Sequence, residues 1–200
     1  MLECDWLARD IGVIPDFLSA QECQDFVDFS EAKVYEGAPV STGRGMVMMK
    51  DVRNNDRVMV DDVAMAAQLY QRVDAFLPPR MEKKWHPCGL NERLRFYRYD
   101  EGQKFDWHQD GYYENPAGER SFLTFMIYLN DGFEGGETLF TKIGGLYLSE
   151  DDLSVKPRRG MALIFRHKIA HTGREVTRGR KYVLRTDVMY RRAPAEPVGA

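Results

Sequence analysis

The first ninety residues carry apolar side chains at helical spacing, interrupted by polar segments. Ser19 to Glu22 has the S-x-x-E form of a helix capping box, and apolar residues such as Phe26 follow it about every third or fourth position. A second segment, residues 61–76, begins with acidic residues, continues with apolar residues at helical spacing and ends before Pro78. This pattern predicts two helices.

After Leu90 the pattern changes to the alternation and short apolar runs that are typical of β-strands. Strands are predicted at residues 94–99, 122–129, 138–140, 162–165 and 182–190, separated by turns that contain glycine or proline. Many short strands after a helical segment favour a β-sandwich or jelly roll with helices on one face. We therefore expect a mainly β protein with flanking α, in a single domain that spans residues 1–200. Residues 1–89 would form a helical N-terminal support region, and residues 90–192 would form the core.

Composition narrows the class of protein. With 200 residues, 44% of them hydrophobic and 30% charged, the chain is typical of one globular domain. A formal net charge of −3 disfavours general nucleic-acid binding. The chain shows neither a long apolar run nor a secretory signal, so no membrane partner is expected. The three cysteines are widely spaced without a CxxC pair, which argues against a disulfide framework or structural zinc site and suits a cytoplasmic protein. The oligomeric state stays open.

Histidines are the first candidates for metal chemistry. His108 and Asp110 form an H-x-D triplet at the end of a predicted strand, and residues two apart on a strand point to one face. A second histidine from a distant strand would complete a facial triad, which suits non-haem Fe(II) and leaves three coordination positions open. His171, just after the predicted strand 162–165, is the candidate for that third ligand.

Other residues compete for these roles. His167 precedes His171 by four residues, and Asp106 shares the predicted strand face of His108, so each offers an alternative ligand. His86 lies in a polar segment and is interpreted as structural. Trp107 should point away from the metal and lie in the core. An H-x-D triplet also arises by chance in a chain of this composition, so a structural role for it stays open.

A cation on the strand after His171 extends the candidate site. A dicarboxylate that chelates a metal through one carboxylate and the adjacent keto oxygen needs a fixed positive partner for its other carboxylate. Lys181 fits this role. On a regular strand Arg185 and Asp187 share its face, so Arg185 is an alternative partner, a contact for an anionic substrate, or the ion-pair partner of Asp187.

These motifs resemble, in order, the signature of the prolyl 4-hydroxylase-like branch of the 2-oxoglutarate/Fe(II) dioxygenases. The segments that carry the resemblance are residues 98–110, 123–130, 135–138, 157–165 and 171–181. The resemblance implies a double-stranded β-helix core (jelly roll, cupin-like) with the N-terminal helices packed on one sheet. It implies that His108, Asp110 and His171 are the catalytic iron ligands. It also implies that Lys181 and Tyr99 bind 2-oxoglutarate, with Arg185 as the alternative cation.

The resemblance further implies a dioxygenase that uses Fe(II), 2-oxoglutarate and O₂, with ascorbate as an accessory reductant. Such an enzyme hydroxylates a C–H bond while 2-oxoglutarate is oxidatively decarboxylated to succinate and CO₂. The expected substrate is a prolyl residue of a peptide or protein. The alternatives are a free amino acid or other small metabolite, and a catalytically silent metal-binding jelly roll that acts as a sensor or interaction module. Residues 34–57 and 142–153 are the expected lid segments, and Arg53 to Arg57 form either a loop over the pocket mouth or an ordinary polar turn.

Overall fold

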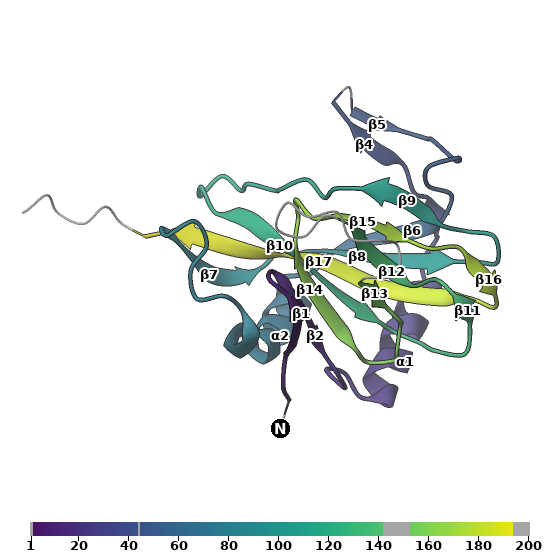
Figure 1. The fold of residues 1–200 in the computed structure, drawn as a ribbon, viewed down its shortest axis with the longest axis horizontal. Coiled ribbons are helices and arrows are strands. Elements are labelled where there is room, and N and C mark those ends of the chain that lie inside the picture. The colour runs from purple at the N-terminus through teal and green to yellow at the C-terminus, as the bar shows by residue number, and fades with distance from the viewer. Residues whose placement is uncertain (1, 44, 142–152, 194–200) are drawn as a thin grey trace, which may run out of the picture.

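The computed structural model describes residues 2–43, 45–141 and 153–193, and its main feature is two antiparallel sheets (Figure 1). The larger sheet has the order β1-β2-β14-β10-β17-β8-β6-β3, and β7 pairs with β17 beside this path. Its strands are β1 (Asp5–Ala8), β2 (Ile11–Ile14), β3 (Glu36–Gly37), β6 (Asp56–Asp61), β7 (Trp85–Leu90), β8 (Arg93–Tyr99), β10 (Arg120–Tyr128), β14 (Ala162–Arg166) and β17 (Lys181–Arg192).

The smaller sheet has the order β13-β12-β15-β9. Its strands are β9 (Phe105–His108), β12 (Thr138–Thr141), β13 (Ser154–Val155) and β15 (Ala170–Gly173). Two short ribbons complete the β structure: β4 (Val40–Thr42) with β5 (Gly45–Val47), and β11 (Glu134–Gly135) with β16 (Val176–Arg178). The expected lid segment at residues 34–57 contains the β4–β5 ribbon, whereas most of the other one, residues 142–152, lies outside the described residues.

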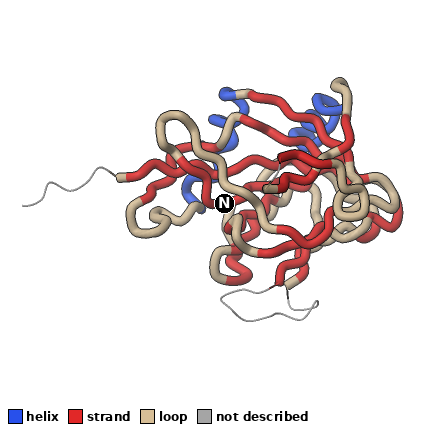
Figure 2. Tube along the Cα trace, turned by 90° about the horizontal axis from the view of Figure 1, so that it is seen from above, coloured by secondary structure: helices blue, strands red, loops and turns tan. Residues whose placement is uncertain are grey.

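Both predicted helices are present and lie on one face of the larger sheet (Figure 2). They are α1 (Ala20–Glu31) and α2 (Val63–Val73), the latter continued by a 3-10 turn at Asp74–Phe76. The capping box at α1 is formed: the Ser19 amide donates to Glu22 Oε2 at 2.7 Å, and the Glu22 amide donates to Ser19 Oγ at 3.2 Å. Asp62 caps α2 by accepting from the Met65 amide at 2.9 Å.

Alternation along the central strands divides the buried side chains between two layers. On β8, Leu94 and Phe96 belong to the apolar cluster that includes the helices. Tyr97 and Tyr99, which alternate with them, belong to a second cluster that also includes Phe140 of the smaller sheet. The fold is therefore mainly β with flanking helices, a double-stranded β-helix, as predicted. The face of the larger sheet that carries Tyr97 and Tyr99 is the inner one.

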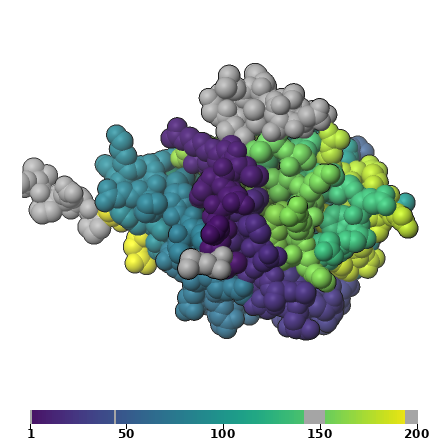
Figure 3. Space-filling view, turned by 60° about the horizontal axis from the view of Figure 1, so that its bottom comes forward, coloured from purple at the N-terminus to yellow at the C-terminus, as the bar shows by residue number. Residues whose placement is uncertain are grey.

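The first 89 residues also contribute strands, which the sequence pattern did not indicate. β2 pairs with β14, and β6 pairs with β8, so both extend the larger sheet. Figure 3 shows the purple N-terminal segment lying against the green segment that contains β14. Ile11–Ile14 is buried throughout, and so short an apolar run has no alternation to reveal a strand. The division at residue 90 stays a prediction. Within the described residues, no helix is long and apolar enough to span a membrane.

Candidate metal and cosubstrate site

Three side chains that can hold one metal ion meet where β9 and β15 run side by side. His108 and His171 are direct partners across these strands, and their ring centroids are 4.2 Å apart. Asp110 follows β9, with Oδ1 3.9 Å from His108 Nε2 and Oδ2 3.7 Å from His171 Nε2. Two ligand atoms that each lie about 2.1 Å from one ion are at most about 4.2 Å apart. Both separations therefore fit a single divalent ion.

Hydrogen bonds fix both imidazoles in the form that binds metal. His108 Nδ1 lies 2.7 Å from the Asp106 carbonyl oxygen, and His171 Nδ1 lies 3.0 Å from the Ile169 carbonyl oxygen. Because a carbonyl only accepts, each Nδ1 carries the proton and each Nε2 keeps a free lone pair. Burial, with the neighbouring His171 second, lowers the pKa of His108 to about 3. Burial likewise lowers the pKa of His171. Both rings are thus neutral at neutral pH.

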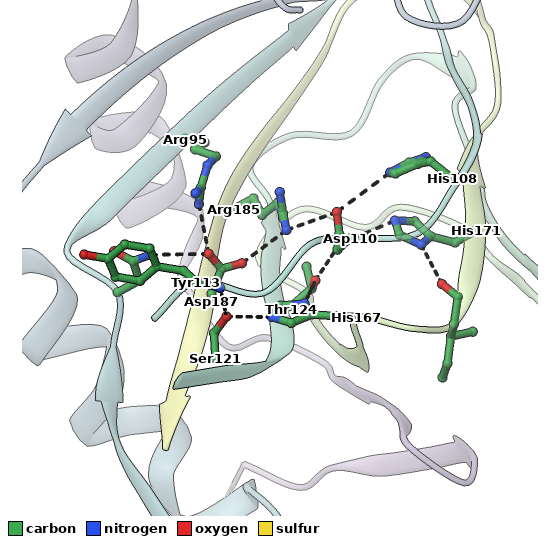
Figure 4. Close-up of polar contacts among 12 residues, drawn as sticks. Arg95, His108, Asp110, Tyr113, Ser121, Thr124, His167, His171, Arg185 and Asp187 are labelled. Carbon is green, nitrogen blue, oxygen red and sulfur yellow. Dashed lines mark hydrogen bonds and ion pairs between the residues drawn. The ribbon is translucent and has the colours of Figure 1, made fainter. Parts of the chain in front are cut away.

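Asp110 is held as an anion although its side chain is only 7% exposed. The Thr124 hydroxyl donates to Asp110 Oδ2 at 2.5 Å, and Arg185 Nη2 lies 3.1 Å from Oδ1 (Figure 4). Burial raises the pKa of Asp110, but the Arg185 charge, the imidazoles and the Thr124 hydrogen bond outweigh it and hold that pKa below its ordinary value. The site therefore offers two neutral nitrogen ligands and one carboxylate.

His167 lies behind Asp110 and is engaged in a different role from the one considered for it. Its Nδ1 lies 3.0 Å from Thr124 Oγ1 and its Nε2 lies 2.9 Å from Ser121 Oγ (Figure 4). Because Thr124 donates its proton to Asp110, it accepts from His167 Nδ1–H, and Ser121 then donates to Nε2. In this series of hydrogen bonds each donor has one acceptor, and the series fixes the orientation of the Asp110 carboxylate. Both ring nitrogens of His167 are thus occupied.

The two remaining expectations near the triad differ from the structure. The Asp106 carboxylate accepts from the Trp107 amide at 2.8 Å and lies 3.5 Å from Lys104 Nζ, and among the described residues it is not part of the group that could hold one ion. The prediction that Trp107 lies in the core is wrong, because its side chain is 40% exposed. β9 is the edge strand of the smaller sheet, and Trp107 alternates with His108 and points away from the pocket.

The triad and the three predicted cosubstrate residues line one cavity between the two sheets. Lys181 begins β17 directly opposite Tyr99 and is 2% exposed. Its ammonium donates to the Gly136 carbonyl at 2.6 Å and lies 5.2 Å from the centre of the Tyr99 ring. Burial lowers the pKa of Lys181 to about 7, and the Glu137 charge opposes that shift. Within residues 2–43, 45–141 and 153–193, no carboxylate forms an ion pair with Lys181, and a buried cation of this kind suits an anionic ligand.

Gly136 makes the position of Lys181 possible. Its φ is +69°, and a Cβ there would lie 3.1 Å from Lys181 Cδ and 3.1 Å from Phe133 Cε2. A larger residue would therefore be strained and would press on the lysine stem. This close approach explains why glycine is found at position 136.

Tyr99 and Arg185 also line the cavity, in different states of engagement. Burial raises the pKa of Tyr99 to about 12, so its hydroxyl stays protonated. Arg185 Nη2 lies 3.1 Å from both Asp110 Oδ1 and Asp187 Oδ1, so this guanidinium already meets two carboxylates (Figure 4). Because Arg185 already has two carboxylate partners, Lys181 is the better candidate for the cation that binds a dicarboxylate. That assignment stays a prediction.

Sequence reasoning missed two residues next to the site. Thr124 was read only as part of an apolar run, although a polar residue within a buried strand was a usable signal. Arg53 was placed in a loop over the pocket mouth, but it is 5% exposed. Its guanidinium lies 4.6 Å from the centre of the Tyr97 ring and 4.2 Å from that of Phe105. No local pattern in the sequence predicts this contact.

A jelly roll that brings two imidazoles and one carboxylate into a pocket with a buried lysine belongs to the mononuclear non-haem metal proteins. The sequence profile described as the 2OG-Fe(II) oxygenase superfamily matches residues 94–186, which include all six predicted site residues. The chain is thus similar to the 2OG-Fe(II) oxygenase superfamily and to prolyl 4-hydroxylases, as the sequence indicated.

Individual relatives agree with this assignment. A probable prolyl 4-hydroxylase 6 of Arabidopsis thaliana is 30% identical over 175 residues, covering 74% of this chain and 55% of the relative. The chain spans about half the length of the curated relatives it matches. A prolyl-4-hydroxylase of Pseudomonas putida has a similar fold, with a TM-score of 0.62 at 16% identity over 93% of this chain and 94% of that one. A Trichoplax adhaerens prolyl hydroxylase gives 0.64 at 15% identity, over 90% and 83%.

Proposed function

We propose that this protein is an Fe(II)- and 2-oxoglutarate-dependent dioxygenase that hydroxylates a C–H bond and converts 2-oxoglutarate to succinate and CO₂. The observation that carries the proposal is the presence of the His108, Asp110 and His171 ligand atoms and the buried Lys181 ammonium in one cavity. Fe(II) in such a site supplies oxygen activation for the oxidation of an unactivated C–H bond.

Different residues would bind the iron and the 2-oxoglutarate. His108, Asp110 and His171 would hold the iron, with Thr124 orienting the carboxylate. Lys181 would bind the far carboxylate of 2-oxoglutarate, and the Tyr99 hydroxyl would donate to the same group. The apolar side chains between the sheets keep bulk water out, which strengthens both ion contacts. Ascorbate as an accessory reductant is part of the proposal.

The substrate that the similarity favours is a prolyl residue of a peptide or protein. The Trichoplax adhaerens neighbour is a prolyl hydroxylase in complex with a hypoxia inducible factor oxygen degradation domain peptide fragment. The alternative is a free amino acid or other small metabolite. The positive charge of Arg185, which lines the cavity, bears on this choice. A cytoplasmic location belongs to the same proposal. It is supported by Cys4, Cys23 and Cys88, which are free thiols.

The direct test is succinate formation from 2-oxoglutarate in the presence of Fe(II) and O₂, with and without a panel of prolyl peptides and amino acids. Chelation of the metal should abolish succinate formation, and Fe(II) should restore it. His108→Ala should remove metal binding and turnover, because no other donor replaces the lost Nε2. His86→Ala is the matched control, since His86 lies on β7, outside the cavity lining, and should behave as wild type.

The alternative of a silent metal-binding module makes the opposite prediction. In that case the protein would bind metal and 2-oxoglutarate, but no succinate would form above the level seen with His108→Ala. That outcome, with any substrate of the panel and in its absence, would reject the enzymatic proposal.

A further inference from the structure

A second cationic region lies beside the same cavity, apart from Lys181, and Arg185 is the member that lines the cavity. Arg185 and Tyr97 line the cavity, and Arg95 is the direct cross-strand partner of Arg185. Arg53 stacks over the rings of Tyr97 and Phe105, which both line the cavity. Lys181 and Arg185 are four residues apart on β17, so their Cα atoms are separated by roughly 13 Å. The two cations therefore mark two separate positions for anions.

The charges in this region do not balance. Asp187 Oδ2 lies 3.2 Å from Arg95 Nη1, and Asp187 Oδ1 lies 3.1 Å from Arg185 Nη2 (Figure 4). One carboxylate therefore forms ion pairs with two guanidinium groups. Asp110, the other carboxylate beside Arg185, is committed to the metal in the proposed function. Arg53 adds a third positive charge, and its Nε donates to the neutral Asn55 Oδ1 at 2.8 Å. An excess of positive charge is left at this end of the cavity.

Tyr97 reports the resulting electrostatic field. Burial raises the pKa of its hydroxyl, but the charges of Arg53, Arg185 and Arg95 outweigh that effect and lower the pKa to about 8. A buried phenol would otherwise titrate above its ordinary value. The positive charges thus more than offset the effect of burial on this phenol.

Two guanidinium nitrogens in this region lack acceptors. Arg53 Nη2 and Arg185 Nε are buried and have no hydrogen-bond partner among the described residues. Arg53 is 5% exposed, so water does not readily supply the missing acceptor. Buried donors are almost always paired, and an unpaired donor on a charged group is especially unfavourable. A negatively charged acceptor is the group that best satisfies such a donor.

We propose that Arg53 and Arg185 bind a carboxylate of the primary substrate, so that this protein acts on carboxylate-bearing molecules. Arg95 acts as a positioning residue, because it shares Asp187 with Arg185 and so leaves Arg185 Nε free for the ligand. This inference rests on the proposed function, since the substrate carboxylate would lie beside the metal that Asp110 holds. A substrate bound there through its carboxylate presents a neighbouring carbon to the metal.

The test uses a minimal carboxylate and its neutral counterpart, trifluoroacetate and trifluoroacetamide, with the full chain loaded with Mn(II) and 2-oxoglutarate. The measurement is the Mn(II)-dependent relaxation of the ¹⁹F signal, which falls steeply with distance from the metal. Trifluoroacetate should show saturable relaxation enhancement and trifluoroacetamide should not. In Arg53→Gln the trifluoroacetate affinity should fall about tenfold, the loss expected for one charge-assisted hydrogen bond.

Two further variants keep the result interpretable. Arg53→Lys keeps the charge but removes the planar fork, so it should bind trifluoroacetate more weakly than wild type even if Arg53→Gln fails to fold. Arg98→Gln is the matched control, because Arg98 lies on the same strand as Arg95 but pairs with Glu31 at 3.2 Å, and its affinity should match wild type. Equal enhancement for both probes, no enhancement, or an unchanged affinity in both Arg53 variants would overturn the proposal.

A competition arm identifies the source of the carboxylate. Free proline displaces trifluoroacetate if the carboxylate is that of an amino acid, and a blocked prolyl peptide containing glutamate displaces it if the carboxylate is an acidic side chain. Displacement by the same blocked peptide with glutamine in place of glutamate would contradict the proposal. Calorimetry of 2-oxoglutarate binding to the Mn(II) protein, done first, distinguishes failure of the proposed function from failure of this inference. Absent 2-oxoglutarate binding rejects the proposed function, whereas absent carboxylate binding alone rejects this inference.

Discussion

The protonation of Lys181 predicts how 2-oxoglutarate affinity depends on pH. In the empty cavity burial lowers the pKa of Lys181 to about 7. A bound carboxylate stabilises the ammonium and raises that pKa, so binding is coupled to proton uptake wherever the free lysine is neutral. The affinity should therefore be constant below the free pKa and fall as the pH rises above it. At high pH each molecule of 2-oxoglutarate should bring one proton into the site.

The magnitude follows from the free pKa alone while the complex stays fully protonated. The apparent Kd is multiplied by one plus the ratio of neutral to charged lysine, so it should rise about thirtyfold between about pH 6 and pH 8.5. Below about pH 7, loss of the cation in Lys181→Met should weaken binding by about 10- to 100-fold, the range for a charge-assisted hydrogen bond. The difference between wild type and Lys181→Met should shrink steadily above that pH.

Isothermal titration of 2-oxoglutarate into the Mn(II)-loaded protein measures both quantities, since buffers of different ionisation enthalpy reveal the protons taken up. Lys181→Arg is the matched variant, because its charge does not titrate in this range and its profile should be flat. A flat wild-type profile with no proton uptake, together with near-normal binding by Lys181→Met, would refute the assignment. Arg185, whose neighbouring carboxylates raise its pKa against the effect of burial, would then be the cation.

Two further predictions test the surroundings of the site. Thr124→Val removes the hydroxyl that orients Asp110 and should lower metal affinity by about tenfold in a metal titration, while Thr124→Ser should bind nearly as wild type. Equal affinity in Thr124→Val would mean that the carboxylate needs no such support. Gly160→Ala should cost at least about 2 kcal/mol in denaturant unfolding, because φ is +81° and a Cβ would overlap the Leu18 carbonyl oxygen. Gly118→Ala, with φ +76° and open space around the Cβ, should cost only about 1 kcal/mol, and an equal loss in both would refute the steric explanation.

Elements with a strong local signal could be predicted from the sequence. The capping box and helical spacing located α1, and the long apolar runs located β10 and β14. β2 and β6 were missed because their strand character depends on the neighbours β14 and β8, with which they pair. A strand that is stabilised mainly by distant partners leaves little trace in its own residues.

The candidate site divides in the same way. The H-x-D triplet, His171 and Lys181 were predicted because the chemistry of metal and dicarboxylate binding restricts residue type and spacing. The neighbours that tune these residues were not, because their contacts are tertiary. Arg53 reaches the site through an isolated bridge to Phe105, and the His167 ring reaches the Asp110 carboxylate through Thr124. Both contacts are created by folding.

The register of β17 relates the two anion positions of the cavity. Lys181 lies opposite Tyr99 and Arg185 lies opposite Arg95, whereas Leu184 between them faces the apolar cluster with the helices. Because side chains alternate along a strand, a slip of one residue would turn Lys181 and Arg185 outward and bring Leu184 to the cavity. The burial of Leu184 thus helps to fix which cations face the metal. The distance between the proposed cosubstrate and substrate positions is set by the rise of one strand, so it cannot change without moving the core.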